Sequence, residues 1–409
     1  MNILIVSQYF WPENFIINDL VEELISRGHN ITIITGKPNY PSGSLNKDYS
    51  LNPDLFSSYS GAEIIRVSIV LRGKTKISLF FNYISFAISA SMIGAYKLRK
   101  KNFDVIFAYE PSPVTVAIPA IIFSKIKRVP LVLWVLDLWP DTLQAYGVIL
   151  SKYFLKFFDK IVRFIYNNCD LILGQSKSYV NLIRERSTNV SVKYFPSWAE
   201  SVFYKTQELN PYKKNNKTTF DVVFSGNTGI AQDFPSILDA MELLKDIDDI
   251  KLIIIGNGSM FEWIESEISK RHLTKSVTLL GRKPLEDMPK LLAEASALLL
   301  SLRDKPIYSI TIPAKLQVYL QAKKPILAMI NGEAADIVNE SNSGITCKSG
   351  DAQCLANAIK AIYSMSDHER IAMGNNAYKF SETWFDRKTL IDQLEDWMRV
   401  LVDRKKLTR

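Results

Sequence analysis

The sequence predicts an α/β protein made of two doubly wound domains. Short apolar runs typical of buried strands alternate with helical patterns, beginning with a strand at 3–10, a helix at 15–28 and a strand at 29–36. A polar, proline-containing stretch at 205–219 interrupts this order, which then starts anew. Because a strand, helix, strand unit of this length places both strands parallel in one sheet, each half is expected to form its own helix-covered sheet.

The length of the chain agrees with two domains. At 409 residues it exceeds the size at which a single hydrophobic core stops growing. We place one domain at 1–200 and the other at 201–384, and the last helix, at about 385–409, is free to pack back on the first domain. Since ligands of open parallel sheets lie beyond the carboxyl ends of the strands, the two domains are expected to face one another across a cleft.

Composition and charge narrow the class of protein. A hydrophobic share of 47% and a charged share of 22% are typical of a folded globular protein. The net charge is +8, and residues 1–200 hold 22 Lys and Arg against 15 Asp and Glu. A basic half attracts nucleic acid or an anionic membrane surface, with a merely solvated basic face as the alternative.

The cysteines and histidines indicate neither a metal site nor a disulfide framework. Cys169, Cys347 and Cys354 have no ligand spacing, and the three histidines are scattered. The start of the chain lacks the basic region and long apolar core of a signal peptide. We therefore expect a cytoplasmic protein that holds no metal.

The apolar stretch Ile77–Tyr96 contains no charged side chain and is long enough to span a membrane. Serines, tyrosines and Asn82 interrupt it, and its large apolar residues recur at helical spacing, which favours a packed or interfacial helix. Basic residues flank it or follow it in the chain: Lys74, Lys76, Lys97, Arg99, Lys100, Lys101, Lys125, Lys127, Arg128, Lys152, Lys156, Lys160 and Arg163. Such residues attract anionic lipid headgroups, so we predict peripheral membrane contact; a helix that only covers the sheet is the alternative.

Two glycine-bearing turns in the second half follow strands and precede helices. Glycine lets backbone N–H groups approach phosphate oxygens, and a helix N-terminus adds roughly half a positive charge. A purely steric need for glycine is the alternative. Neither turn fits the dinucleotide fingerprint, and no GKS or GKT loop occurs, which disfavours a nicotinamide cofactor. The residues expected at the phosphate are Gly226, Asn227 and Gly229 in one turn, and Gly256 and Asn257 in the other.

Six motifs occur in order over nearly the whole chain: YFWPENFIINDL, GKPNYPSG, DLWPD, FSGNTGIAQDF, IGNG and the run from SLRDK to GEAADI. Together they resemble glycosyltransferase family 4. DLWPD, GN-x-G-x-x-Q and P-x-K-L-Q-x-Y-L resemble more narrowly the bacterial surface-polysaccharide branch of WbuB/WcaI-like fucosamine transferases. The resemblance implies a GT-B fold, a nucleotide sugar held mainly by the C-terminal domain, an acceptor held mainly by the N-terminal domain, retention of anomeric configuration and no divalent metal.

Without a metal, basic side chains must neutralise the departing diphosphate. Many members of the family carry an arginine and a lysine near the first turn of the second domain, where this chain has Asn227 and Gln232. The expected replacements are Arg303 and Lys315, with Arg282 nearer the base or ribose; exposed charges near strand ends are the alternative.

Two further departures concern the sugar and the ribose. Ile310 and Val318 occupy the positions of the family's acidic pair, so we expect Glu333 to hold the ribose, unless it only serves the dipole of its helix. Leu136 stands where many relatives have a histidine that reaches the 6-hydroxyl of the sugar. An unpartnered hydroxyl is costly to desolvate, so a 6-deoxy donor such as UDP-N-acetylfucosamine is the hypothesis.

The acceptor side is expected at the carboxyl ends of three strands of the first domain. Asp137 is the candidate for orienting the acceptor hydroxyl. The loops after the first two strands supply the other candidates: Glu13, Asn14, Lys37, Asn39 and Tyr40. The prolines and glycine of the second loop could serve the turn alone.

The sequence therefore predicts a retaining, metal-independent transfer of an N-acetylated hexose from a UDP-sugar to a lipid-linked saccharide. The setting is O-antigen, capsule or exopolysaccharide assembly at the inner face of the plasma membrane, without a nucleic-acid partner. The alternatives are a UDP-sugar 2-epimerase of similar fold and a non-catalytic sugar-nucleotide-binding subunit.

Overall fold

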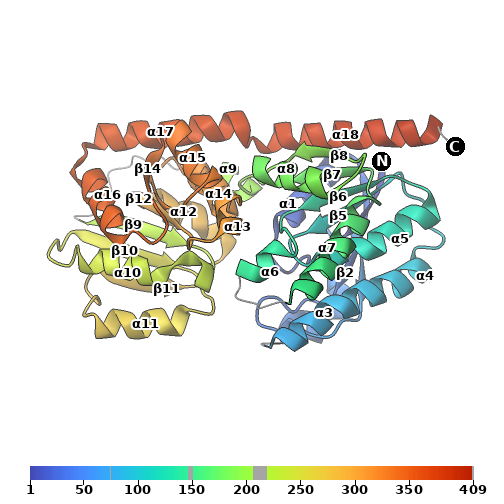
Figure 1. The fold of residues 1–409 in the computed structure, drawn as a ribbon, viewed down its shortest axis with the longest axis horizontal. Helices are drawn as coiled ribbons and strands as arrows, with labels where there is room; N and C mark the ends of the chain where they lie inside the picture. The colour runs from blue at the N-terminus through green and yellow to red at the C-terminus, as the bar shows by residue number, and fades with distance from the viewer. Residues whose placement is uncertain (74, 146–150, 206–218, 408–409) are drawn as a thin grey trace. The chain divides into compact units, whose positions relative to one another are not determined.

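The structure is a computed structural model that describes residues 1–73, 75–145, 151–205 and 219–407. Contacts divide the chain into two compact units, one comprising Met1–Pro196 with Lys388–Arg409 and the other Ser197–Arg387. Figure 1 shows a sheet with helices in each unit. Lys74 and most of the polar stretch between the two halves, at 206–218, lie outside the described residues.

The first unit contains an eight-stranded sheet in the order β3-β4-β2-β1-β5-β6-β7-β8. All of its neighbouring strands pair in parallel except β3 and β4, which are antiparallel. The central strands are buried along nearly their whole length, as expected for a parallel sheet covered on both faces. The strands are β1 (Asn2–Val6), β2 (Asn30–Gly36), β3 (Ser58–Tyr59), β4 (Ala62–Val67), β5 (Val105–Glu110), β6 (Leu131–Val135), β7 (Leu171–Gly174) and β8 (Ser191–Tyr194).

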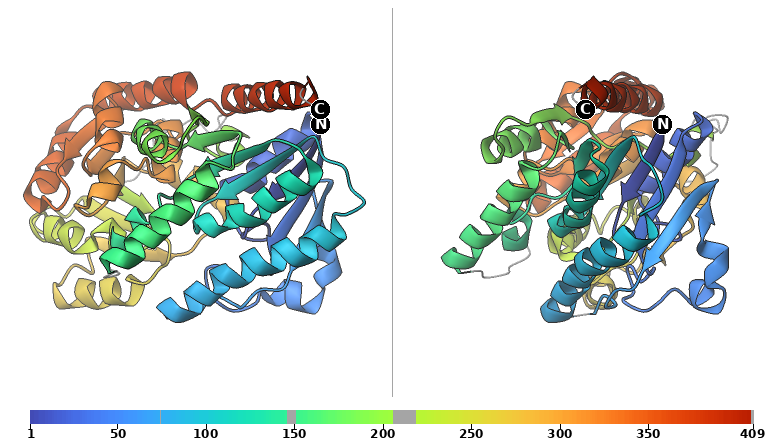
Figure 2. Two further views of the ribbon diagram at one scale, coloured as in Figure 1. Left: turned by 45° about the vertical axis from the view of Figure 1, so that its right-hand side comes forward. Right: turned by 90° about the vertical axis from the view of Figure 1, so that its right-hand side faces the viewer.

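Right-handed crossovers that run in opposite directions across a sheet place their helices on opposite faces. Consequently α1 covers one face, and α3, α5 and α7 cover the other (Figure 2). A capping box of Thr75 and Ser78 starts α3, which continues through a π-turn at Ala90–Gly94 into α4. The helices are α1 (Ile16–Ser26), α2 (Lys47–Leu51), α3 (Lys76–Ser89), α4 (Ala95–Lys97), α5 (Ala117–Lys127), α6 (Asp141–Ala145), α7 (Lys152–Tyr166), α8 (Lys177–Arg186) and α18 (Arg387–Leu407).

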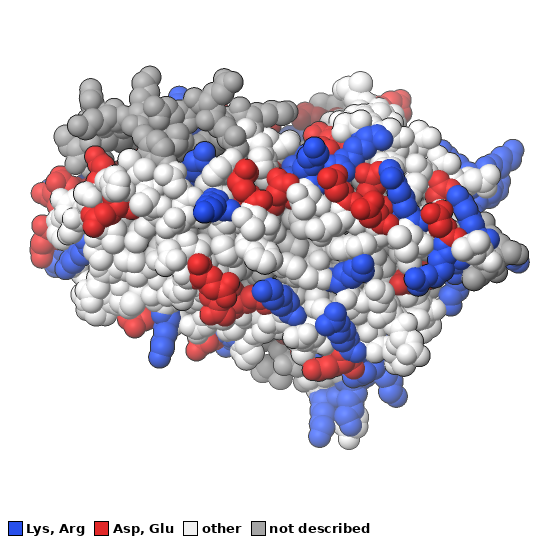
Figure 3. Space-filling view, turned by 90° about the horizontal axis from the view of Figure 1, so that it is seen from above, with Lys and Arg blue, Asp and Glu red and all other residues white. Residues whose placement is uncertain are grey.

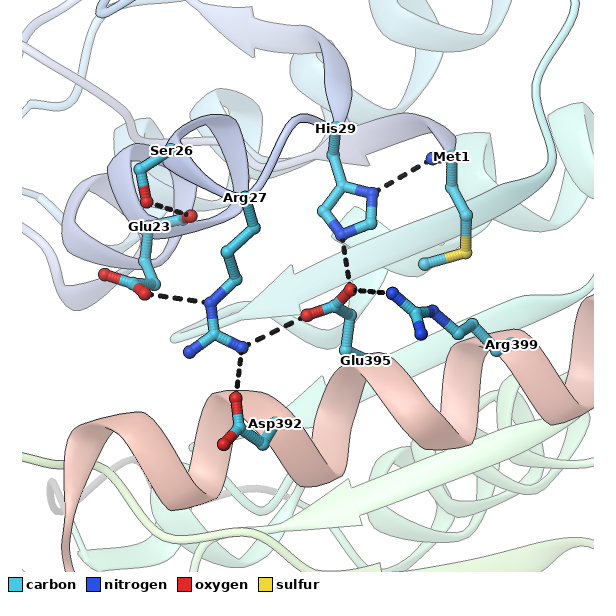
Figure 4. Close-up of polar contacts among 8 residues, drawn as sticks. All are labelled: Met1, Glu23, Ser26, Arg27, His29, Asp392, Glu395 and Arg399. Carbon is cyan, nitrogen blue, oxygen red and sulfur yellow. Dashed lines mark hydrogen bonds and ion pairs between the residues drawn. The ribbon is translucent and has the colours of Figure 1, made fainter.

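The C-terminal helix α18 belongs to the first unit and is fixed there by a charged network (Figure 4). Arg27 Nη1 lies 2.5 Å from Asp392 Oδ1 and 3.1 Å from Glu395 Oε2. His29 Nε2 lies 2.9 Å from the other oxygen of Glu395, and the amino group of Met1 lies 3.0 Å from His29 Nδ1. Burial lowers the pKa of His29, whose ring links the amino terminus to α18.

We expect Glu395→Ala to lower the free energy of unfolding by about 1–3 kcal/mol, because it removes a shared acceptor from partly buried donors of Arg27 and His29. The matched control is Asp403→Ala on the same helix, an exposed position where a change within about 0.5 kcal/mol is expected. Urea denaturation followed by circular dichroism measures both. Equal losses in the two variants would show that the network contributes nothing.

The second unit contains a six-stranded, wholly parallel sheet in the order β11-β10-β9-β12-β13-β14. Separate apolar clusters fill its two sides. The strands are β9 (Phe220–Ser225), β10 (Ile250–Ile255), β11 (Val277–Gly281), β12 (Ala297–Ser301), β13 (Ile326–Met329) and β14 (Gly344–Cys347). The helices are α9 (Ser201–Lys205), α10 (Phe234–Glu242), α11 (Phe261–Lys270), α12 (Met288–Ala293), α13 (Pro306–Ser309), α14 (Ala314–Gln321), α15 (Glu333–Glu340), α16 (Ala352–Ser364) and α17 (Asp367–Trp384).

One disulfide joins Cys347 and Cys354, whose Cα atoms are 5.7 Å apart, while Cys169 is buried and free. This bond corrects the expectation from the sequence, which indicated no disulfide framework. The pairing arises because the turn after β14 brings the strand end to the first turn of α16, where Asp351 accepts a hydrogen bond from Cys354 N.

The described part of the chain holds one helical segment, Ile77–Lys97, that is long and apolar enough to cross a membrane. Only 33% of its most apolar window is buried.

Candidate functional site

In each sheet the strand order reverses at one point, between β1 and β5 in the first unit and between β9 and β12 in the second. Ligands of open parallel sheets bind outside the carboxyl ends of the strands at such a point. In the second unit, the loops after β9 and β12 meet there, since Ser301 Oγ donates to Gln232 O at 2.7 Å and Arg303 N donates to Ala231 O at 2.9 Å.

The two predicted glycine turns pack directly against each other beside this point. Thr228 N donates to Asn257 O at 3.2 Å. A Cβ atom on Gly256, whose φ is +144°, would lie 1.8 Å from the carbonyl oxygen of Gly226. A Cβ atom on Gly258 would lie 2.3 Å from Asn227 Oδ1. Close backbone approach therefore requires glycine here, and the structure brings the predicted residues of both turns together.

Lys315 lies at the same place, in the first turn of α14. Its Nζ atom donates to Gln232 Oε1 at 2.6 Å and lies 3.7 Å from the centroid of the Phe224 ring. A Cβ atom on Gly226 would be 3.5 Å from this nitrogen. Burial lowers the pKa of Lys315 well below its usual value, and no carboxylate among the described residues forms an ion pair with it. An anionic ligand strongly stabilises a desolvated ammonium group whose neighbours are neutral.

The remaining donor-side candidates lie around the same edge of the sheet. Arg303 is half-exposed, with Nε 3.5 Å from Asp233 Oδ1, so part of its charge is already engaged. Arg282 follows β11 and is exposed, and Glu333 is the half-buried first residue of α15. Gly226, Gln232 and Lys315 thus form the compact part of the predicted site.

On the acceptor side, Glu13 is buried and bound by the backbone. Its Oε1 accepts hydrogen bonds from Asn39 N at 2.7 Å and Tyr40 N at 2.6 Å, and its Oε2 accepts one from Phe10 N at 3.3 Å. The carboxylate therefore ties the loop after β1 to the loop after β2. This arrangement makes Glu13 a positioning residue.

The other loop candidates divide by exposure. Asn39 is buried, donates to Lys37 O at 2.8 Å and accepts from Arg72 N at 2.8 Å. Tyr40 and Asn14 are exposed and Lys37 is half-buried, so these three side chains are accessible to a ligand.

Asp137 follows β6 and is held by a polar cluster. Its Oδ1 accepts from Thr142 Oγ1 at 2.5 Å. Burial raises the pKa of Asp137, while hydrogen bonds from Thr142, Ser112 and Trp139 oppose that rise. Asp141 begins α6 and forms an ion pair with Arg186 at 2.6 Å. Asp137 is thus the better placed of the two carboxylates to bind a hydroxyl.

Glu110, the last residue of β5, is a candidate that was not expected from the sequence. Its side chain is fully buried, and neither carboxyl oxygen has a hydrogen-bond partner among the described residues. Burial, with the charge of Asp137 as a smaller cause, raises the pKa of Glu110 well above its usual value. The available signal was a carboxylate that ends an otherwise apolar strand at the reversal point.

We expect Glu110→Gln to remove a pH dependence of stability. A carboxyl group whose pKa is raised by folding contributes stability below its unfolded value of about 4.3 and loses it as pH rises towards the folded pKa. One such group accounts for up to about 1.4 kcal/mol per pH unit. In chemical denaturation, the free energy of unfolding of the variant should therefore rise relative to that of the wild type as pH increases from 5 to 8. Glu185→Gln, at an exposed site, is the control, and parallel curves for all three proteins would contradict the assignment.

Several solved structures share this fold. HepE of Anabaena in complex with UDP and glucose matches with a TM-score of 0.68 at 15% identity, over 98% of this chain and 99% of that one. Sucrose-phosphate synthase of Thermosynechococcus elongatus matches with a TM-score of 0.73 at 15% identity, over 98% and 99%. WaaG, a glycosyltransferase involved in lipopolysaccharide biosynthesis, matches with a TM-score of 0.66 at 13% identity, over 97% and 99%. The chain has the GT-B fold, as the sequence predicted.

The second half can be assigned more closely. Residues 206–380 match the family model Glycosyl transferases group 1. Comparison with curated protein sequences finds no match. The predicted resemblance is therefore confirmed at the level of a group 1 glycosyltransferase domain, which contains the glycine turns and Lys315.

Proposed function

We propose that the chain is a retaining, metal-independent glycosyltransferase that moves a hexose from a UDP-sugar to a lipid-linked saccharide. The observation that carries the donor part is Lys315, a desolvated cation with no carboxylate partner among the described residues, placed beside two glycine turns at the reversal point of the sheet. A diphosphate supplies the missing negative charge. HepE, which shares the fold, was solved with UDP and glucose.

Each donor-side group then has a physical task. Lys315 and Arg303 neutralise the charge that develops on the departing diphosphate, and backbone N–H groups of the turns at 226–229 and 256–259 bind its oxygens. Gln232 positions the ammonium group of Lys315 through their 2.6 Å hydrogen bond. Arg282 and Glu333 recognise the base and ribose. No step requires a metal ion.

In the first unit, Asp137 orients the acceptor hydroxyl, and the leaving phosphate takes its proton on the same face of the sugar. The exposed side chains of Asn14 and Tyr40 and the half-buried Lys37 contact the acceptor saccharide. Glu13 and Asn39 hold the two loops in place through the hydrogen bonds to backbone groups. The proposal therefore requires that the second unit binds the donor and the first unit binds the acceptor.

The sugar follows from Leu136, a half-buried apolar residue next to Asp137. An apolar contact at C6 favours a 6-deoxy, N-acetylated sugar such as N-acetylfucosamine, because a hydroxyl group there would lose its hydration without a partner. Initial rates with UDP-N-acetylglucosamine and its 6-deoxy analogue test this choice. A clear preference for the hydroxylated sugar would rule it out.

The acceptor is proposed to be a lipid-linked saccharide of O-antigen, capsule or exopolysaccharide assembly, met at the inner face of the plasma membrane. The test is transfer of labelled sugar to a lipid extract, with an incubation of the UDP-sugar alone beside it. Epimerisation of the donor without acceptor would favour the 2-epimerase, and UDP binding without any transfer would favour the non-catalytic subunit.

A further inference from the structure

The helix layer formed by α3, α5 and α7 of the first unit presents apolar side chains to solvent. The layer is continuous, because α5 contacts both of the other helices. On α3 and its continuation, exposed apolar residues recur at helical spacing from Ile77, which is 71% exposed, through Phe81 and Ile88 to Met92, also 71% exposed. Residues of one stripe point in one direction, so α3 carries an unpartnered apolar edge.

α7 carries a second exposed apolar edge, in a segment for which the sequence drew attention only to Lys152, Lys156, Lys160 and Arg163. Tyr153, Phe157 and Phe164 are 85%, 58% and 56% exposed and lie on one stripe of the helix. The opposite side is buried through Phe158, Val162 and Ile165. The helix therefore has one apolar side against the protein and another towards solvent.

The charge of this layer is one-sided. Among the described side chains from Ile77 to Lys97, in α5 and in α7 there are seven Lys and Arg residues and one acidic residue, Asp159. Asp159 is already paired with Arg163 at 2.7 Å. The face that carries α18 differs, since acidic and basic side chains lie interspersed on it (Figure 3). Exposed aromatic residues beside unbalanced cations are the features that bind an interface of apolar chains and anionic headgroups.

We propose that the outer face of α3, α5 and α7 docks on an anionic lipid bilayer, with the aromatic edge of α7 entering the headgroup region. This inference rests on the proposed function, which places the acceptor in a membrane, and it specifies the surface that reaches it. Trp139 connects the surface with the acceptor site. Its ring packs against Tyr83 of α3 and Phe158 of α7, and its Nε1 donates to Ser112 Oγ at 3.2 Å beside Asp137.

Flotation of the full-length protein with vesicles tests the proposal. The wild type should float with phosphatidylglycerol-containing vesicles at low salt and much less with pure phosphatidylcholine. Lys152→Gln with Lys156→Gln should weaken binding about 30-fold at low salt, and Tyr153→Gln with Phe157→Gln should weaken it at least about tenfold at any salt concentration. Val400→Gln removes an exposed apolar residue of α18 and should leave binding unchanged.

Equal binding to both vesicle types, or binding that survives the aromatic double substitution, would overturn the proposal. Loss of a dimer in light scattering upon the aromatic substitutions, without vesicle binding by the wild type, would assign the surface to a second copy of the chain. Transfer to an acceptor dispersed in detergent is measured in parallel. Docking variants should keep that activity, whereas a wild type that floats but transfers no sugar refutes the proposed function and leaves the surface standing.

Discussion

Replacing Lys315 with alanine should lower kcat about 10²- to 10³-fold while the protein remains folded. The ammonium group of the half-buried Lys315 lies beside the glycine turns, donates to Gln232 and lies over the face of Phe224. Removal of one preorganised charge donor from a desolvated site costs this much in other enzymes. Stability should not fall, because an unpaired buried charge is itself costly.

Initial rates with the preferred UDP-sugar and isothermal titration with UDP measure the effect. Lys275→Ala is the matched control. Lys275 is exposed and precedes β11, so it lies at the amino end of that strand, whereas the predicted site lies at the carboxyl ends. UDP affinity of the wild type should also decline as pH rises above the lowered pKa of Lys315, because only the protonated amine attracts the diphosphate. Unchanged turnover in Lys315→Ala would contradict the assignment of the donor site to this position.

The second large effect is expected from Gly256→Ala, which should destabilise the second unit by about 3 kcal/mol or more and abolish UDP binding. The added Cβ atom would lie 1.8 Å from Gly226 O, a backbone atom that cannot move without separating the two turns. Its φ of +144° adds strain for any residue with a side chain.

Gly281→Ala separates these two causes. Gly281 also has a positive φ, +64°, but no atom lies within 4 Å of its added Cβ. The free energy of unfolding of Gly281→Ala should therefore fall by only about 1 kcal/mol, from backbone strain alone. Thermal denaturation with and without UDP compares the variants. If both lose the same stability, the close approach of the two turns is not what makes glycine necessary at position 256.

The fold was predictable because its signals are local. The strands β1, β5 and β9 appear as mostly apolar runs since both faces of a parallel sheet are buried, and the helices between them follow the 3.6-residue period. The glycine turns were recognisable for a similar reason, because tight strand-to-helix turns require particular residues at fixed positions. Lys315 was selected by resemblance to a family, and its neighbours in the structure give that choice a physical basis.

The parts that could not be predicted depend on contacts between distant residues. Glu13 was expected to face a ligand, but the backbone of residues 39 and 40 takes up its carboxylate. Glu110 became noticeable only through its burial, and the pairing of Cys347 with Cys354 depends on the turn between them. In each case the neighbouring residues in the sequence do not reveal which distant groups the side chain contacts in the fold.

By itself, then, the amino-acid order determined where strands, helices and glycine turns occur, because those features depend on backbone preferences and periodicities of neighbouring residues. Tertiary packing alone decided which charges lose their water, as at Lys315 and Glu110, and which apolar side chains keep it, as along α7. Solvation depends on what surrounds a side chain in space, and the surrounding residues come from distant parts of the sequence.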